Sequence, residues 1–131
     1  MANEALPTLN QLISGANSIN FYNYQKQAGD TAIYPERGEM GGMMYLALGL
    51  ASEAGEVAGK LKKLYRDGPY DQKKSDEFID DLGKEIADVL WYLAMIAEDS
   101  GLDLGKLAKG NLDKLASRKK RGVIGGSGDN R

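Results

Sequence analysis

Apolar residues recur with a helical period along most of the chain, and no stretch shows the strict alternation of a β-strand. Between residues 43 and 65 the apolar positions are separated by alternating steps of four and three, as on one face of a long helix. That predicted seam consists of Met43, Ala47, Leu50, Ala54, Val57, Leu61 and Leu64. At about 1.5 Å per residue, the helix is expected to be roughly 35 Å long.

A second long helix is predicted after a turn at residues 67–69, where Gly68 favours a helix end and Pro69 cannot continue the hydrogen-bond ladder. We expect this helix to begin at Ser75, because a hydroxyl cap followed by two acidic residues favours a helix N-terminus. Gly101 is expected to end it. Its predicted seam is Phe78, Leu82, Ile86, Val89, Leu93 and Ile96.

Shorter helices are predicted on either side of this pair. Thr8, with Gln11 three residues later, forms a capping-box pattern and predicts a helix over residues 8–16. The helical pattern resumes at Ser18 and ends near Gly29, and a loop with Pro35, Gly38, Gly41 and Gly42 follows.

At the other end, Asp103 is expected to cap a last helix, and residues 122–131 form a glycine-rich tail. The inner face of that helix is predicted to carry Leu104, Ala108, Leu112 and Leu115. The pattern predicts an all-α fold, a bundle of about four helices in one domain spanning residues 1–131.

The composition agrees with one folded domain, since 131 residues with 42% hydrophobic and 27% charged side chains are typical of a globular protein. With 17 basic and 19 acidic residues, the net charge of -2 gives no general attraction to nucleic acid. No apolar stretch approaches the roughly 20 residues of a membrane span, and the N-terminal residues lack the pattern of a secretion signal. We therefore expect a cytoplasmic protein.

The sequence contains no Cys and no His, which excludes thiolate metal sites, Cys nucleophiles and Ser-His-Asp triads. Ser52 therefore has no partner that would make it a nucleophile. Any chemistry must rely on carboxylates, hydroxyls, amines and a metal ion.

Two pairs of acidic residues stand out, Glu53 with Glu56 and Glu85 with Asp88. The members of each pair are three residues apart, so they share one helix face. Each acid directly precedes a seam residue, which places it at the edge of the apolar seam. If the two long helices pack antiparallel, the four carboxylates converge, and their repulsion requires a cation. An all-oxygen donor set suits Mg²⁺ or Mn²⁺ rather than zinc.

The competing interpretation is that these acids are only solvated helix surface, in which case the chain is a helical interaction module without catalysis. Spacing alone leaves both interpretations open.

Basic and amide side chains form a second stripe on the last predicted helix. Asn111, Lys114, Arg118 and Arg121 follow at steps of three, four and three beside its apolar face. Such a stripe is suited to phosphate binding, although a solvated basic helix end has the same pattern.

Two lysines and two aromatic residues near the acids have both a functional and a structural interpretation. We expect Lys60 to form an exposed ion pair with Glu56, and Lys63 is a weaker candidate for phosphate binding. Trp91 and Tyr92 could stack on a nucleobase, but on a long helix core packing is the favoured interpretation.

At these residues the sequence resembles the MazG-like nucleoside triphosphate pyrophosphohydrolases of the all-α NTP pyrophosphatase superfamily. The matching motifs are ExxE at residues 53–56 and ExxD at residues 85–88, with family-like surroundings at residues 45–50, 89–93 and 111–118. Two features depart from the family pattern, namely Ala87 where Gly is frequent and a long segment between the motifs.

The resemblance implies that the four acids bind Mg²⁺ and that Asn111, Lys114 and Arg118 contact the triphosphate. It also implies a homodimer or homotetramer with sites completed near subunit interfaces.

The expected reaction is Mg²⁺-dependent attack of water on the α-phosphorus of a nucleoside triphosphate, which yields a monophosphate and pyrophosphate. Without His, the metal or a carboxylate must supply the base, and Glu53 or Glu56 is the candidate. Deoxynucleotides are the expected substrates, and a dUTP- or dCTP-specific hydrolase of the same superfamily is the alternative.

Overall fold

All regular structure in residues 19–128, the part of the chain that the computed structural model describes, is helical. The helices are α2 (Phe21–Gly29), α3 (Met40–Asp67), α4 (Gln72–Asp99) and α5 (Leu104–Lys120). The predicted all-α fold of about four helices is confirmed. The helix predicted over residues 8–16 lies outside the described residues.

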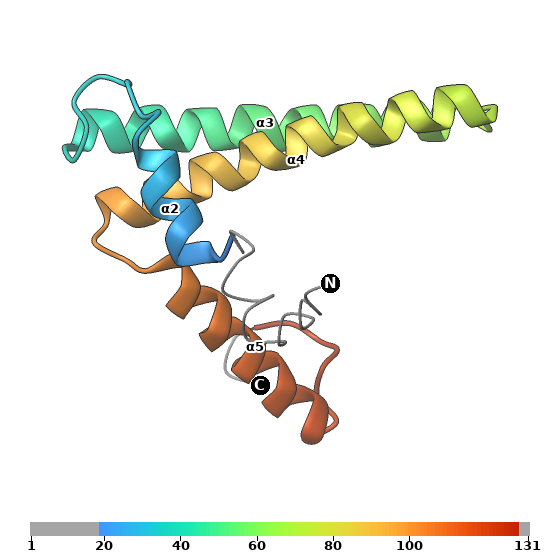
Figure 1. The fold of residues 1–131 in the computed structure, drawn as a ribbon. Helices are drawn as coiled ribbons and strands as arrows, with labels where there is room; N and C mark the ends of the chain where they lie inside the picture. The colour runs from blue at the N-terminus through green and yellow to red at the C-terminus, as the bar shows by residue number, and fades with distance from the viewer. Residues whose placement is uncertain (1–18, 129–131) are drawn as a thin grey trace, which may run out of the picture.

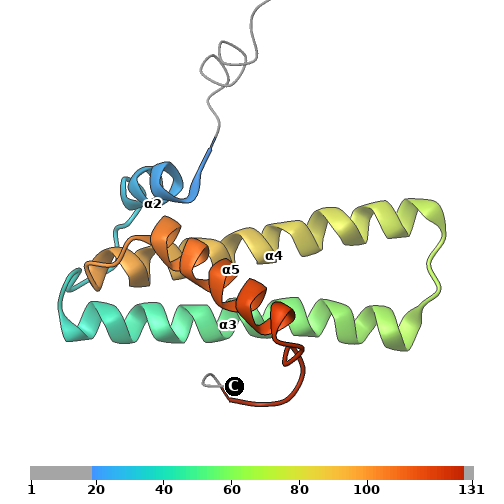
Figure 2. The same ribbon diagram turned by 90° about the horizontal axis from the view of Figure 1, so that it is seen from below.

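The long helices α3 and α4, each of 28 residues, form an antiparallel hairpin (Figures 1 and 2). The short helix α2 packs against α4 at the end of the hairpin away from the α3–α4 turn. Helix α5 follows from that same end and packs against α2 and α4 but not against α3. One end of the hairpin is therefore covered by two further helices, and the other end projects alone.

Both long helices begin earlier than the sequence predicts. Helix α3 starts at Met40, so Gly42, expected in a loop, lies within its first turn together with Gly41. A Cβ atom at Gly42 would come within 2.9 Å of the Glu36 carbonyl carbon, so only glycine allows the preceding loop to approach this closely. Helix α4 starts at Gln72 rather than Ser75.

Capping by aspartate explains where α4 and α5 begin. The Asp71 carboxylate accepts a 2.9 Å hydrogen bond from the Lys74 backbone N–H, which provides the cap that was assigned to Ser75. Asp103 accepts the equivalent bond from the Lys106 N–H at 2.9 Å, as predicted. The predicted stop at Gly68 is also confirmed, because α3 ends at Asp67.

The face of α3 that packs against α4 is rotated from the predicted seam. Leu46 is fully buried, whereas the predicted seam residues Ala47, Ala54 and Leu61 are exposed. On α4, Ile86 and Leu93 are likewise exposed, and the residues directly before them are partly buried. The other predicted seam residues, among them Met43, Leu50 and Val57, are partly buried, so the predicted seam was wrong only at the exposed positions. The error arose because each helix carries two neighbouring apolar stripes, and periodicity does not show which one faces the other helix of the same chain.

The buried core lies at the covered end of the hairpin. Leu46, Ala94 and Met95 have no exposed surface, and Tyr34 from the loop before α3 is 7% exposed. The Trp91 ring meets Tyr34 edge-on, with 6.2 Å between ring centroids. Trp91 therefore belongs to the packing around the core, which was the favoured interpretation of its sequence position.

Gln25 is buried, with 3% of its surface exposed, and its side-chain amide connects three helices. Its Nε2 donates to the Glu98 carboxylate at 2.6 Å and to the Leu102 carbonyl at 2.9 Å. Its Oε1 accepts a 2.7 Å bond from the Leu104 backbone N–H at the start of α5. These bonds satisfy buried polar groups and set how α2 and α5 sit on α4.

We expect Glu98→Gln to lower the free energy of unfolding by about 1 kcal/mol at pH 7, because a charge-assisted hydrogen bond becomes a neutral one. Hydrogen bonds from Lys26 and then Gln25 lower the pKa of Glu98 below its ordinary 4.5. A lowered folded-state pKa stabilises the protein above pH 4.5, and this contribution is lost as the pH falls through the folded-state pKa. Urea unfolding at pH 7 and pH 3 should therefore show the difference only at pH 7.

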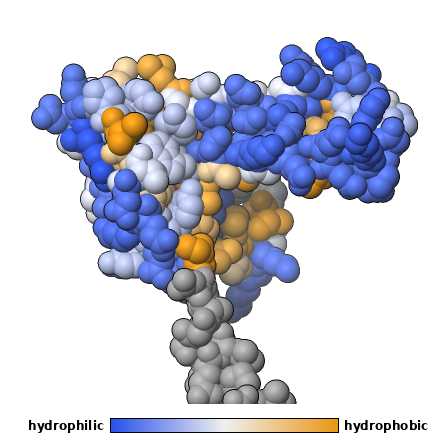
Figure 3. Space-filling view, turned by 45° about the horizontal axis from the view of Figure 1, so that its top comes forward, coloured by the Kyte–Doolittle hydropathy of each residue, from blue (hydrophilic) through white to orange (hydrophobic). Residues whose placement is uncertain are grey.

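Hydrophilic side chains dominate the projecting end of the hairpin, whereas apolar side chains reach the surface around the covered end (Figure 3). None of the described helices is long and apolar enough to cross a lipid bilayer.

Candidate active site

Three carboxylates from the two long helices meet in the hairpin. Glu53 of α3 and Glu85 and Asp88 of α4 each place one oxygen within 4.8 Å of the other two. Glu53 and Glu85 are partly buried between the helices, and Asp88 is exposed at the edge. We call these three residues the acid cluster. It joins both predicted motifs through antiparallel packing of the helices that carry them.

The electrostatic environment of Glu53 shows that the acid cluster holds excess negative charge. Burial, followed by the charges of Asp88, Glu56 and Glu85, raises the pKa of Glu53 above its ordinary value. Like charges at this spacing disfavour the ionised carboxylate unless a cation shares the site.

The donor set of the acid cluster fits a hard divalent cation. All three side chains offer carboxylate oxygens, which Mg²⁺ and Mn²⁺ prefer, and an exposed edge at Asp88 leaves room for water and phosphate ligands. Bound Mg²⁺ would also remove the repulsion that raises the pKa of Glu53. Glu53, Glu85 and Asp88 are thus the residues that would hold it.

Glu56, the fourth predicted metal ligand, is not part of this three-oxygen group. It is exposed one turn beyond Glu53 and lines a cavity of about 370 Å³ with Lys60, Lys63 and the small residues beside them. Its charge still acts on Glu53 of the acid cluster.

Lys60 is the cation directly beside the acid cluster. Its ammonium lies 3.2 Å from the Glu85 carboxylate and 3.8 Å from Asp81, and the side chain is 24% exposed. The expected exposed pair with Glu56 was wrong, because Lys60 lies on the face of α3 that packs against α4. The lysine thus provides partial charge compensation for Glu85.

Tyrosines adjoin the acid cluster on the side of the covered end. Burial and then the Asp88 charge raise the pKa of Tyr24. Burial also raises the pKa of Tyr92, with further contributions from Tyr45, Glu53 and Asp88. The Tyr92 ring packs against Gly49, where a Cβ would lie 2.7 Å from its hydroxyl oxygen. Tyr92 therefore packs between the helices, close enough to Glu53 and Asp88 for their charges to act on its hydroxyl.

The basic stripe of α5 lies apart from the acid cluster in this chain. Helix α5 does not contact α3, and its C-terminal half runs away from the hairpin (Figure 1). Asn111, Lys114 and Arg121 are exposed, whereas Arg118 is buried, and its guanidinium donates a 3.4 Å bond to the Gly128 carbonyl. Phosphate binding by this stripe stays a prediction.

The sequence analysis placed Lys60 and Tyr92 near the acids, but it missed the ion pair of Lys60 with Glu85 and the approach of Tyr24 to Asp88. A usable signal was the spacing of Glu53 and Lys60, which are seven residues apart and therefore on one helix face. This spacing puts Lys60 on the same face as Glu53, two helical turns further along α3.

Fold and site together define an all-α protein whose helical hairpin brings together three carboxylates that could hold a metal ion. Residues 43–123 match the family model of the MazG nucleotide pyrophosphohydrolase domain. The chain is also 49% identical over 111 residues to the Gene 37 protein of Mycobacterium phage L5, which covers 82% of this chain and 96% of the phage protein. No solved structure matches the chain significantly. The chain belongs to the MazG nucleotide pyrophosphohydrolase family.

Proposed function

We propose that this protein hydrolyses a nucleoside triphosphate at the α-phosphorus, with Mg²⁺ bound at the acid cluster, and releases a monophosphate and pyrophosphate. The observation that supports this most strongly is the meeting of Glu53, Glu85 and Asp88 within a domain of this family. When bound there, Mg²⁺ neutralises phosphate charge and lowers the pKa of a coordinated water.

In this proposal the carboxylates have separate roles. Glu53, Glu85 and Asp88 hold the ion, while Glu56, exposed outside that group, accepts the proton of the attacking water. The α-phosphate lies between the acid cluster and Glu56. Of the two candidate bases in the sequence, we favour Glu56, because Glu53 is one of the three carboxylates whose oxygens lie within 4.8 Å of one another and Glu56 is not.

Replacing Glu56 by Gln tests this division of roles. We expect turnover to fall about a hundredfold or more, because a general base is lost, while Mg²⁺ affinity by calorimetry stays within a few-fold of wild type. Loss of Mg²⁺ binding together with activity would instead make Glu56 a ligand. Activity at the wild-type level would remove Glu56 from the mechanism.

A panel of ribo- and deoxynucleoside triphosphates with Mg²⁺, in which both products are identified, tests the reaction itself. We expect monophosphate and pyrophosphate, with deoxynucleotides preferred. Hydrolysis of dUTP or dCTP alone would identify the more specific hydrolase. No hydrolysis, combined with no heat of Mg²⁺ binding, would support the non-catalytic interaction module.

We also propose that two copies pair through the outer faces of the hairpin. An exposed apolar stripe follows α3 at alternating steps of four and three, the pattern of a helix–helix seam. It consists of Met40, Met44, Ala47, Ala51, Ala54, Ala58, Leu61 and Tyr65, of which Met40 is 77% and Tyr65 is 93% exposed. Ile79, Ile86 and Leu93 repeat every seven residues on α4 and are also exposed.

A second hairpin fits this surface because it offers the same two apolar stripes, so that a four-helix arrangement buries both copies. The assembly is then a homodimer, or a homotetramer if two dimers associate. Such pairing could also bring the α5 stripe of one subunit toward the acid cluster of the other.

We expect Ala58→Arg to convert the assembly to monomers, because a charge placed in an apolar seam lacks a partner. Sedimentation velocity would measure the change, with Asp80→Arg, an exposed position on α4, as the control for an added arginine. A wild-type monomer at micromolar concentration would refute the proposed pairing.

A further inference from the structure

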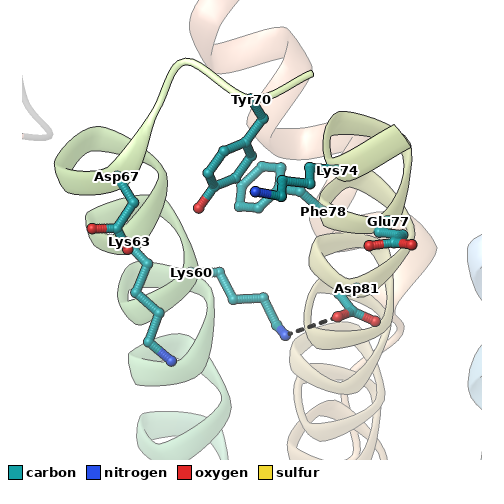
Figure 4. A pocket seen from close by; sticks show the side chains of 8 residues that line it. All are labelled: Lys60, Lys63, Asp67, Tyr70, Lys74, Glu77, Phe78 and Asp81. Atoms are coloured by element: carbon teal, nitrogen blue, oxygen red, sulfur yellow. Dashed lines mark ion pairs between the residues drawn. The ribbon is translucent and has the colours of Figure 1, made fainter. Parts of the chain in front are cut away.

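A second cavity, of about 530 Å³, opens between α3 and α4 next to the α3–α4 turn (Figure 4). Lys60 and Lys63 line it from α3, Lys74 and Phe78 line it from α4, and Tyr70 comes from the turn. We call it the lysine cavity. The smaller cavity beside Glu56 shares Lys60 and Lys63 with it, and Lys60 also pairs with Glu85 of the acid cluster.

The side chains in the lysine cavity are arranged to receive an anion. Lys60 crosses the gap between the helices, and the Lys74 ammonium and the Tyr70 hydroxyl point into the same gap (Figure 4). Tyr70 and Phe78 meet edge-on with ring centroids 6.2 Å apart and wall off the end nearest the turn. Ammonium groups and a phenol hydroxyl are donors, which suit phosphate oxygens.

Three carboxylates also line the cavity, and each has a cation partner outside the lining, although Asp81 pairs with Lys60 of the lining as well. Asp67 is bound by Arg66 at 2.6 Å, Glu77 pairs with Lys73 at 3.8 Å and Asp81 pairs with Lys84 at 2.8 Å. Within the described residues Lys63 and Lys74 form no ion pair within 4.0 Å. In the part of the chain that the structure describes, Lys63 and Lys74 are therefore the lysines of the cavity whose ammonium groups are not held in an ion pair, and the charge of Lys63 also acts on the nearby Asp67 carboxylate.

The two sides of the acid cluster along the hairpin carry different kinds of side chain. Tyrosines adjoin the acid cluster toward the covered end, and lysines adjoin it toward the turn. Asp81 lies one turn of α4 from Glu85, a rise of about 6 Å, so the lysine cavity begins directly beyond the acid cluster. A polyphosphate bound at the acid cluster is attracted to the lysine side, since its charge is negative throughout.

We infer that the lysine cavity binds the β- and γ-phosphates of the substrate, and hence the pyrophosphate that leaves, with Lys63 and Lys74 as its principal contacts. The inference rests on the proposed function and adds the orientation of the substrate. The nucleoside then lies toward the tyrosines and the covered end of the hairpin. Lys60, between Glu85 and the cavity, contacts the phosphate next to the acid cluster.

Calorimetry with inorganic pyrophosphate in the presence of Mg²⁺ tests this inference on the full chain. We expect the double variant Lys63→Met with Lys74→Met to weaken pyrophosphate binding at least tenfold. The matched control is Lys62→Met with Lys106→Met, which removes the same charge at exposed positions outside the cavity and should change the affinity less than twofold.

A nucleoside monophosphate lacks the two terminal phosphates, so its affinity should be unchanged in the Lys63/Lys74 variant. An equal loss for monophosphate and pyrophosphate would overturn the orientation, and so would unchanged pyrophosphate binding. Circular dichroism and unchanged Mg²⁺ affinity would show that the variant is folded.

The two proposals fail separately. If wild type hydrolyses nucleotides but pyrophosphate binding does not depend on Lys63 and Lys74, the inference is overturned and the proposed reaction stands. If wild type hydrolyses none of the nucleotides yet pyrophosphate binding is lost selectively in the variant, the polyphosphate site is supported and the reaction is not.

Discussion

Glu53→Gln is expected to lower kcat/KM about a hundredfold or more and to make the metal-free protein more stable than wild type. The loss follows from removing a carboxylate that holds Mg²⁺ beside the substrate phosphates. The gain follows because burial and three neighbouring acids raise the pKa of Glu53, so its charge destabilises the metal-free fold. Thermal unfolding with and without Mg²⁺ should show a higher Tm without metal and little further rise with it.

The pH dependence separates this electrostatic effect from a packing effect. A carboxyl group with a raised folded-state pKa costs stability as the pH rises from its ordinary 4.5 through the raised value. The stability gain of Glu53→Gln should therefore be present at pH 7 and vanish below about pH 4. Asp80→Asn, at an exposed position within α4, is the control and should change neither Tm nor activity appreciably. A metal-free variant less stable than wild type at pH 7 would contradict the acid cluster described here.

Gly49→Ala is expected to lower the free energy of unfolding by about 1–3 kcal/mol, although alanine favours helices over glycine by about 1 kcal/mol. The reason is that the Tyr92 ring occupies the space where the new Cβ would lie. The two helices must then separate, which also moves Glu53 away from Glu85 and Asp88. Urea unfolding should show the lost stability, and calorimetry should show weaker Mg²⁺ binding.

Gly83→Ala is the matched control for this prediction. Gly83 is exposed on α4, and a Cβ there would meet nothing within 4 Å. Only the helix-propensity term remains, so stability should rise by about 0.5–1 kcal/mol. If Gly49→Ala were also stabilising, Tyr92 would not be packed against α3.

Local signals in the sequence located the helices well where the signal was unambiguous. The Asp103 cap and the stop at Gly68 are where the sequence placed them, because each depends on residues within one turn. The start of α4 was misplaced because two residue types able to cap, Asp71 and Ser75, lie within four positions of each other. The early start of α3 was missed because its glycines are suited to a loop, and only the approach of Glu36 explains them.

The candidate site was predictable in part, because the spacing within each acidic pair is also a local signal. Glu53, Glu85 and Asp88 could be named from their spacing, which fixes the helix face of each pair whatever the tertiary structure. Glu56 was placed with them, yet helix rotation leaves it outside the three-oxygen group. The lysine cavity could not be predicted, since it depends on how side chains from two helices and a turn meet across the hairpin.

The sequence by itself determined the all-α fold, the antiparallel pair of long helices and the four acids, because helical periodicity, caps and turn residues act over a few positions. Only the tertiary structure decided which of two apolar stripes on α3 and α4 packs inside the chain. That choice depends on packing between residues far apart in the sequence, such as the close contact of Gly49 with Tyr92. It places Lys60 beside Glu85 and leaves the other stripe on the surface.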